Sequence, residues 1–371
     1  MTSDETLAGD GAPRSDEAGW PPVSSLRTID QIVRRAEASL APGPWDFGRA
    51  GAGEEVTVQR NRAAWRGLAL VPSVLRDVSS IDVSTTFLGI DVALPVLCAP
   101  VGALTVFHPD GAAATAIGAA REGTVGVIGV LSSPGFAEVQ SRSGGRNLFQ
   151  IYVSGDERWL DSLVERVSEA DPVGLCVTVD SAVHARRDRL LEGSFDWRIE
   201  TGGAMPPNLE GLGRQRSFQK SFTWAALERL RARTELPLVI KGIITAEDAR
   251  RAVDVGVQAV YVSNHGGRGL DHGLSTVEVL EEVVDAVGDR AEVVLDSGVR
   301  RGTDVCKAVA LGAQAVLIGR LQCWGLAAGG ADGVAQVLRI LRAEIENTMA
   351  LMGARTLAEL TPASVRKTIA V

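Results

Sequence analysis

Eight short runs of apolar residues recur along the chain from residue 95 onward, and polar or glycine-containing segments separate them. Short runs rich in valine, isoleucine and leucine that end at turn residues are typical of buried strands. Because the runs are apolar throughout rather than alternating, we expect both faces of each strand to be covered, as in a parallel sheet. The predicted strands are Pro95–Ala99, Val125–Val130, Phe149–Val153, Leu175–Val179, Leu238–Ile240, Ala259–Val262, Val293–Leu295 and Ala315–Ile318.

Segments with the apolar spacing of amphipathic helices lie between these strands. They include Gly111–Arg121, Trp159–Glu169, Trp224–Arg233, Ala246–Val255, Val277–Val287 and Thr303–Leu311. Eight strand–helix units in about 225 residues predict an α/β fold, a (β/α)8 TIM barrel. A doubly wound open sheet is the alternative, which is weaker because no Gly-x-Gly-x-x-Gly sequence follows the first strand.

The chain ahead of the first strand has a different pattern. Residues 1–22 are rich in Asp, Glu, Ser, Gly and Pro and predict a disordered tail, whereas residues 23–371 are predicted to form a single barrel domain. That domain opens with a helical extension. An amphipathic helix over Leu26–Leu40 stops at Pro42-Gly43-Pro44, and a second helical stretch follows a glycine-rich turn over Val56–Leu68.

The connection after the fourth strand is unusually long. About 60 residues separate the starts of the fourth and fifth strands, and residues 190–221 within it are rich in Gly, Pro and Arg. Barrel active sites are built from the loops that follow strands, where long irregular loops are usually lids or specificity elements. We interpret residues 190–221 as a lid-like insertion, with a disordered insertion as the alternative.

Composition narrows the class of protein. The 371 residues are 45% hydrophobic and carry a net charge of −8, which argues against nucleic acid as a partner. No apolar run approaches the roughly 20 residues of a membrane span, and the polar N-terminus lacks a signal-peptide core. Four scattered cysteines suggest buried thiols in a reducing compartment. We therefore expect a cytoplasmic protein that does not bind to a membrane.

One histidine stands at a predicted strand end. The sixth strand runs into Ser263-Asn264-His265-Gly266-Gly267-Arg268, so a glycine turn holds a base near a fixed cation. This pair suits chemistry on an anionic substrate with a removable proton. Taken alone, the same turn could hold a structural histidine. No cysteine or carboxylate cluster accompanies His265, so the sequence predicts no metal site.

Other strand ends carry polar groups that a barrel would bring together. The seventh and eighth ends combine glycines with Arg300 and Arg320. Backbone N–H groups of glycine-rich loops and arginine forks suit a phosphate dianion. Because these groups occur in register at neighbouring strand ends, we predict a cofactor that bears a phosphate.

Several motifs together resemble the FMN-dependent α-hydroxy acid oxidase/dehydrogenase family, which includes glycolate oxidase, lactate oxidase, mandelate dehydrogenase and 4-hydroxymandelate oxidase. The resemblance runs from about Leu26 to the C-terminus and is closest to the hydroxymandelate oxidase branch. The motifs that carry it, in family order, are Phe-Gln-Ile-Tyr (149–152), Thr-Val-Asp (178–180), Ile-Lys-Gly-Ile-Ile-Thr-Ala-Glu-Asp-Ala (240–249), Ser-Asn-His-Gly-Gly-Arg (263–268), Asp-Ser-Gly-Val-Arg-Arg-Gly-Thr-Asp-Val (296–305) and Ile-Gly-Arg (318–320).

The resemblance implies a role for each matched residue. His265 would be the catalytic base, with Asp180 stabilising its charged form. Arg268 and Arg187 would hold the substrate carboxylate, and Tyr152 would donate a hydrogen bond to the substrate. Lys241 would lie near the N1–C2=O edge of the flavin. Arg300, Gly319 and Arg320 would bind the FMN phosphate. The full set of implied FMN-binding residues is Pro100, Val101, Gly102, Ser132, Gln150, Thr178, Lys241, Ser263, Asp296, Gly298, Arg300, Gly319 and Arg320.

The chain departs from the family pattern at positions that bear on substrate choice. Phe47 stands where many members have a tyrosine that touches the substrate carboxylate, and Gly102 stands where members with small substrates have alanine. The missing methyl at Gly102 leaves room for a larger substituent, so we expect an aromatic or bulky (S)-2-hydroxy acid. Ser297 replaces a family glycine, and its hydroxyl could contact the phosphate.

Alternative functions remain open at this stage. A lactate-type oxidase or monooxygenase would keep the same site, and an isomerase would keep the barrel and FMN. A catalytically inactive binding subunit would have lost His265, Arg268 or Lys241, and all three are present. The expected partners are a small 2-hydroxy acid and O2 or another electron acceptor, in a homotetramer as is usual for the family.

Overall fold

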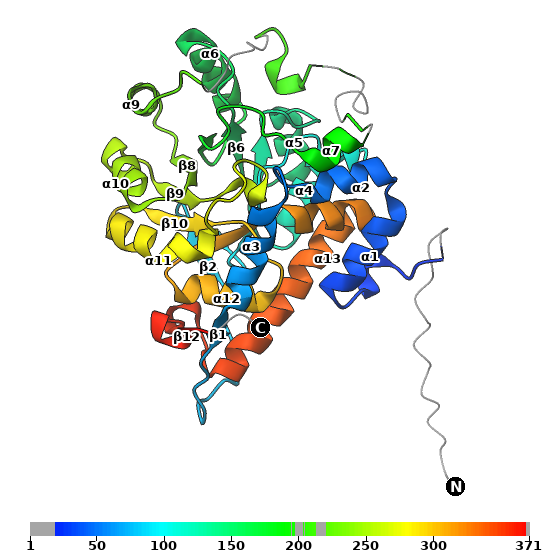
Figure 1. The fold of residues 1–371 in the computed structure, drawn as a ribbon, viewed down its shortest axis with the longest axis vertical. Coiled ribbons are helices and arrows are strands. Elements are labelled where there is room, and N and C mark those ends of the chain that lie inside the picture. The colour runs from blue at the N-terminus through cyan, green and yellow to red at the C-terminus, as the bar shows by residue number, and fades with distance from the viewer. Residues whose placement is uncertain (1–18, 194, 197–202, 204, 213–219, 369–371) are drawn as a thin grey trace.

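The computed structural model describes residues 19–193, 195–196, 203, 205–212 and 220–368. Eight parallel strands close into a barrel in the order β10-β11-β4-β5-β6-β7-β8-β9, as the apolar runs predicted (Figure 1). Each pairs with its neighbours in parallel register, so the closed sheet leaves no strand edge exposed. The strands are β4 Val96–Cys98, β5 Gly126–Gly129, β6 Asn147–Ile151, β7 Leu175–Thr178, β8 Leu238–Ile243, β9 Ala259–Val262, β10 Glu292–Leu295 and β11 Ala315–Ile318.

Helices form the outer layer of the barrel, and their apolar faces pack on the outward faces of the strands. Helices α4, α9 and α10 have the predicted bounds, whereas α5 was not predicted. Helix α13 turns sharply at Gly329-Gly330, where the backbone leaves helical geometry. The layer comprises α4 Gly111–Arg121, α5 Phe136–Ser143, α6 Glu157–Ser168, α9 Trp224–Arg233, α10 Ala246–Val255, α11 Thr276–Val287, α12 Gly302–Ala310 and α13 Arg320–Met352.

The N-terminal extension contains α1 Ile29–Ser39, α2 Pro42–Arg49 and α3 Val56–Arg66. The first predicted helix does end before Pro42-Gly43-Pro44, but the sequence analysis did not foresee that these residues begin a second helix, α2. First-turn N–H groups have no partner within the helix, so prolines are tolerated there. Helices α1 and α2 both contact α13 (Figure 1).

Short strands that the apolar pattern did not predict close the other end of the barrel. The hairpin β2 Thr85–Phe87 and β3 Ile90–Val92 inserts Phe87 into the cluster that fills the barrel interior. Strand β1 Leu68–Leu70 pairs with β12 Val365–Lys367 near the C-terminus. This end is therefore packed shut, and the opposite end remains for a site.

One sequence prediction falls largely, and another partly, outside the described residues. The predicted tail over 1–22 is described only from residue 19, and the predicted insertion over 190–221 is described only in part. The described part includes the end of α7 Asp188–Glu192 and Phe195, whose ring lies 5.9 Å from that of Phe47. The segment after β7 thus packs against α2. Among the described helices, none is long and apolar enough to cross a membrane.

Candidate active site

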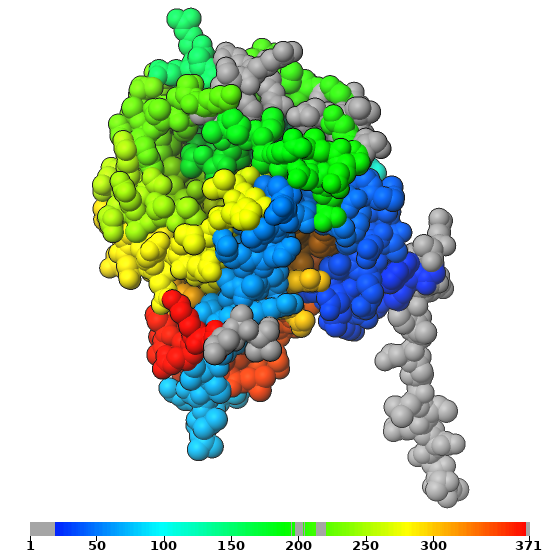
Figure 2. Space-filling view, viewed as in Figure 1, coloured from blue at the N-terminus to red at the C-terminus, as the bar shows by residue number. Residues whose placement is uncertain are grey.

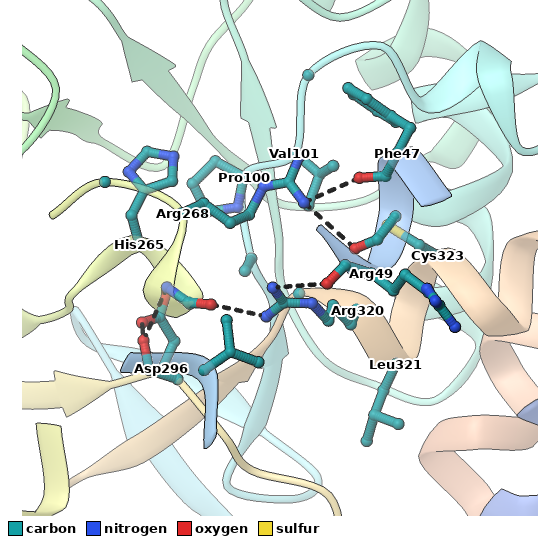
Figure 3. Close-up of a pocket in the computed structure, with 18 of the residues that line it drawn as sticks. Phe47, Arg49, Pro100, Val101, His265, Arg268, Asp296, Arg320, Leu321 and Cys323 are labelled. Atoms are coloured by element: carbon teal, nitrogen blue, oxygen red, sulfur yellow. Dashed lines mark hydrogen bonds between the residues drawn. The ribbon is translucent and has the colours of Figure 1, made fainter. Parts of the chain in front are cut away.

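A cavity of about 500 Å³ lies at the carboxyl end of the barrel strands. Residues from the N-terminal extension and from the loops after the strands line it together (Figure 3). Most of the predicted site residues are among them: Phe47, Pro100, Val101, Gly102, Tyr152, Arg187, Lys241, His265, Arg268, Asp296, Gly298, Arg300, Gly319 and Arg320.

The remaining predicted residues do not line the cavity but support its walls. Asp180 and Ser263 bond to the lining residues His265 and Lys241 respectively. The side chains of Gln150 and Thr178 on neighbouring strands are buried and bond to each other at 2.9 Å. The hydroxyl of Ser132 is buried and has no hydrogen-bond partner among the described residues. A buried unpaired hydroxyl costs about 1–3 kcal/mol, which a bound polar group would offset.

His265 sits between an acid and a phenol. Its Nδ1 lies 3.0 Å from Asp180 Oδ1, and its Nε2 lies 3.2 Å from the Tyr152 hydroxyl. An ionised carboxylate can only accept hydrogen bonds, so Nδ1 carries the proton and Tyr152 donates to Nε2. Ser181, which the sequence analysis did not single out, places its hydroxyl 3.2 Å from Nδ1. Nε2 is therefore the basic atom.

Neighbouring charges set the ionisation of these groups. Burial raises the pKa of Asp180, but attraction to Lys241 and His265 outweighs burial and lowers that pKa to about 2. Burial and Lys241 lower the pKa of His265, although Asp180 opposes them. Burial raises the pKa of Tyr152 to about 12. At neutral pH the imidazole is thus neutral beside a charged carboxylate, which suits it to accept a proton.

Lys241 provides a buried positive charge at the end of β8. Its Nζ donates to Ser263 Oγ at 2.9 Å and lies 3.9 Å from Asp296 Oδ2, which also accepts from the Tyr261 hydroxyl at 2.8 Å. Burial disfavours the ammonium, but Asp180 and Asp296 outweigh burial and raise the pKa of Lys241. The lysine therefore stays charged and can stabilise negative charge that develops nearby.

A backbone irregularity places Lys241 beside Asp180. The pairing of β8 with β9 shifts between Lys241 and Ile243, and Gly242 between them has φ 112°. A Cβ on Gly242 would come within 2.6 Å of the Asp180 Cβ. Only glycine combines that backbone conformation with such a close approach. The predicted fifth strand ended too early, at Ile240, because Lys241 and Gly242 interrupt the apolar run although β8 continues to Ile243.

Among the arginines that line the cavity, Arg187, Arg268 and Arg320 are mostly buried. Burial is the main cause that lowers the pKa of each, and Arg187 and Arg320 lower the pKa of Arg268 further. The Nε atoms of Arg187 and Arg320 are buried with no hydrogen-bond partner among the described residues. Buried like charges are costly unless an anion compensates them, so the three guanidiniums define an anion site.

The carboxyl end of α2 fixes two of these guanidiniums. Nη1 of Arg268 donates to the carbonyls of Phe47 at 2.9 Å and Ala50 at 2.7 Å. Nη2 of Arg320 donates to the Ala50 carbonyl at 3.1 Å, and its Nη1 donates to the Gly266 carbonyl at 2.8 Å. Carbonyls at a helix C-terminus carry partial negative charge, which stabilises cations. Backbone carbonyls therefore fix the orientation of both guanidinium groups.

The residues predicted to bind phosphate differ in their settings. Gly319 and Arg320 stand at the N-terminus of α13, where free N–H groups and the helix dipole favour an anion. Arg300 lines the cavity, but its guanidinium is 43% exposed and pairs with Asp30 of α1 at 3.1 Å. The phosphate contact of Arg300 stays a prediction.

Helix α3 anchors two of the active-site loops, which the sequence analysis missed. Asn61 and Asn264 exchange side-chain hydrogen bonds of 3.0 and 2.7 Å, and Trp65 donates to the Ser297 carbonyl at 3.0 Å. In Figure 2 the blue N-terminal segment lies directly against the yellow segment that follows His265. Contacts between residues some 200 positions apart leave no local sequence pattern.

An aromatic cluster on one part of the cavity lining was also missed. Trp45, Phe47, Phe107 and Trp324 all line the cavity. The ring centroids are 4.4 Å apart for Trp45 and Trp324, and 6.0 Å apart for Phe47 and Phe107. Phe47 was a predicted site residue, but tryptophan and phenylalanine are ordinary core residues, so residue type alone did not identify Trp45, Phe107 and Trp324. Their packing gives the cavity an apolar side.

The barrel and its cavity define a class of protein, one that holds an anionic substrate between a histidine base and buried cations. Comparison with known families makes this specific: the profile of the FMN-dependent dehydrogenases matches residues 36–367. The chain therefore belongs to the FMN-dependent dehydrogenase family, and it is an FMN-dependent 2-hydroxy acid oxidase or dehydrogenase.

Individual relatives act on different hydroxy acids. A peroxisomal (S)-2-hydroxyacid oxidase of Arabidopsis thaliana is 41% identical over 93% of this chain and 97% of its own length. An L-lactate oxidase of Nostoc is 40% identical over 91% of this chain and 97% of its own. The crystal structure of a mandelate oxidase superposes with a TM-score of 0.83 at 37% identity, covering 93% of this chain and all of that one.

The site fits FMN. The Ser132 hydroxyl lacks a partner, Lys241 offers a buried ammonium, and the N-terminus of α13 with Arg320 offers an anion site. These groups match the polar ring, the electron-rich edge and the phosphate of a flavin nucleotide. Ser132, Lys241 and Arg320 are thus the residues whose settings fit FMN, and the FMN contacts of the other implied residues stay predictions.

Proposed function

We propose that the enzyme oxidises a mandelate-like (S)-2-hydroxy acid, with an aromatic or bulky substituent, to the 2-oxo acid. The observation that carries this proposal is the open space at Gly102. A Cβ there would meet only Leu131, at 3.5 Å, within 4 Å. Leu131 and the aromatic cluster line the same cavity. An apolar substituent therefore finds room and apolar contacts that a small substrate would leave unused.

Each residue of the site has a defined task in this reaction. Arg268 and Arg187 bind the substrate carboxylate, and Tyr152 donates a hydrogen bond to the substrate. Nε2 of His265 takes the proton that the substrate releases, while Nδ1–H keeps its bond to Asp180. The Asp180 carboxylate stabilises the imidazolium formed. FMN, when bound, would supply the acceptor for the two electrons and for the second hydrogen that this oxidation releases.

Lys241 and the apolar lining complete the chemistry. The ammonium, held by Ser263 and Asp296, supplies a fixed positive charge where electron density increases during the reaction. The aromatic side of the cavity excludes water from the reacting atoms, which strengthens these electrostatic interactions. We propose O2 as the electron acceptor, since the relatives from Arabidopsis and Nostoc are named oxidases.

The proposal extends to assembly and location. We propose a cytoplasmic homotetramer. Val74, Leu75 and Leu351 support assembly, because they expose 79%, 102% and 70% of their surface, and exposed apolar side chains are often covered by a partner subunit. All four cysteines are buried free thiols, which suits a reducing compartment. Light scattering of the purified protein measures the assembly.

The test is the visible spectrum of the purified protein under anaerobic conditions. Flavin absorbance should bleach faster with (S)-mandelate or 4-hydroxymandelate than with L-lactate, and should return in air. A colourless protein that binds no FMN would contradict the assignment, and bleaching by lactate alone would contradict the bulky-substrate proposal. The matched variant His265→Ala should retain FMN but bleach far more slowly, by about 10²–10⁴-fold.

A further inference from the structure

The turn that carries His265 has an unusual backbone. His265, Gly266 and Gly267 have φ of 60°, 66° and 73°, all in the left-handed region. A non-glycine residue there costs roughly 1–2 kcal/mol, so surrounding contacts must hold the turn in place. A base must also be held closely, since a displacement of about 1 Å can slow a reaction 10²-fold.

Side-chain oxygens hold the three successive N–H groups of this turn. The N–H of His265 donates to Ser263 Oγ at 3.1 Å, and that of Gly267 to Asn264 Oδ1 at 3.1 Å. The N–H of Gly266 donates to Ser297 Oγ at 3.0 Å. Of these three acceptors, only Ser297 belongs to a different strand end, the loop after β10.

Ser297 is itself firmly held. Its hydroxyl donates to Asp296 Oδ1 at 2.6 Å, and Asp296 is fixed in turn by Tyr261 and lies near Lys241. Ser297 is buried and has φ 80°, a conformation that favours glycine. The hydroxyl of Ser297 thus acts both as a donor and as an acceptor, and these two hydrogen bonds offset the strain of a left-handed backbone at a non-glycine residue.

We propose that Ser297 is a positioning residue that ties the His265 turn to the Asp296–Lys241 pair. Its hydroxyl links the N–H of Gly266 to the Asp296 carboxylate, so the base and the buried ammonium move as one unit. We propose this role in place of the expected contact with the cofactor phosphate, because the hydroxyl's single hydrogen is donated to Asp296. The inference rests on the proposed role of His265 as the base.

Two variants separate the hydroxyl from the backbone strain. Ser297→Ala removes the hydroxyl and keeps a strained backbone, whereas Ser297→Gly removes both and suits the left-handed conformation. The control is Asp171→Gly, which relieves a left-handed residue at φ 49° that is exposed and does not line the cavity. Each of the three variants is compared with the wild-type protein, both with FMN bound and as the apoprotein.

Two measurements test the proposal. The first is an NMR titration of protein labelled with ¹⁵N-histidine, whose spectrum is simple because the chain has four histidines. The signal that is missing in His265→Gln belongs to His265. Its titration should shift in both Ser297 variants and stay unchanged in Asp171→Gly. The rate of anaerobic flavin reduction should fall by about 10- to 100-fold in both variants, with a matching shift in its pH profile and similar FMN affinity.

Three outcomes would overturn the proposal. One is an unchanged His265 titration in both variants, and another is a normal Ser297→Gly beside an impaired Ser297→Ala, which would assign the effect to strain. The third is weakened FMN binding with an unchanged His265 titration, which would assign the hydroxyl to the cofactor. Failure of the proposed function can be told apart from failure of this inference. If the proposed function is wrong, no 2-hydroxy acid bleaches the wild-type protein, but the His265 titration in the apoprotein still shows whether Ser297 positions the turn.

Discussion

Gly102→Ala should change substrate preference without damaging the fold. The added Cβ would lie 3.5 Å from the Leu131 Cβ, an ordinary contact, and would meet no other heavy atom within 4 Å beyond its chain neighbours. The methyl therefore fills cavity space instead of displacing protein. One methyl in a specificity pocket is worth about 1–3 kcal/mol. We expect kcat/KM for (S)-mandelate to fall by about 10- to 200-fold, while that for L-lactate changes little.

The assay is anaerobic stopped-flow reduction with each substrate separately. Leu131→Ala in the Gly102→Ala background is the matched control, since it reopens space beside the added methyl and should restore part of the mandelate rate. Thermal unfolding checks the fold, and Gly102→Ala should not lower Tm, because alanine restricts the unfolded chain. An equal loss for both substrates, or an unchanged ratio, would refute the assignment of this space to the substituent.

Further changes test the charges and the carboxylate site. The depressed pKa of His265 means that the base is neutral above about pH 6.5, so flavin reduction should be constant there and slow as pH falls below the pKa. Asp180→Asn should lower the pKa of His265 further and slow reduction by about 10²–10⁴-fold. Tyr261→Phe removes a donor to buried Asp296 and should lower the free energy of unfolding by about 1–3 kcal/mol in urea titrations. Phe47→Tyr adds a hydroxyl beside Arg268, whose guanidinium carbon lies 5.3 Å from the ring centre, and should tighten binding of a 2-oxo acid by about 2- to 12-fold in spectral titrations.

For each of these predictions, one outcome would contradict the reasoning behind it. A reduction rate that already falls as the pH drops toward 6.5 from above would contradict a base whose pKa is depressed by burial. A wild-type rate in Asp180→Asn would show that the carboxylate does not support the imidazolium. Unchanged unfolding of Tyr261→Phe would mean that Asp296 finds another donor, and weaker binding by Phe47→Tyr would mean that the cavity is too tight there for a hydroxyl.

Local pattern predicted most of the barrel. The strands were recognisable because both of their faces are buried, and α4, α9 and α10 have the predicted bounds since polar loops and glycines end them. The site residues at strand ends could be predicted too, because barrel geometry makes positions after different strands converge. The end of β8 was not predicted, because the polar Lys241 and Gly242 interrupt its apolar run before Ile243.

Contacts between distant segments could not be predicted in this way. The bond between Asn61 and Asn264 and the packing of Trp45 on Trp324 join segments far apart in the chain. The side chain types involved are common in cores and on helix surfaces, so only the folded structure reveals their role. The same holds for Ser297, whose two bonds depend on how the loops after β9 and β10 meet.

The anchoring of Arg268 by α2 has a consequence for how such enzymes diverge. The arginine is aimed by the carbonyls of Phe47 and Ala50, and every amino acid provides a carbonyl. The side chain at position 47 lines the cavity and packs on the guanidinium, yet it is not what aims it. Mutation at position 47 can therefore alter which substituent the enzyme accepts, while Arg268 keeps the orientation in which we propose that it binds the carboxylate common to all 2-hydroxy acids.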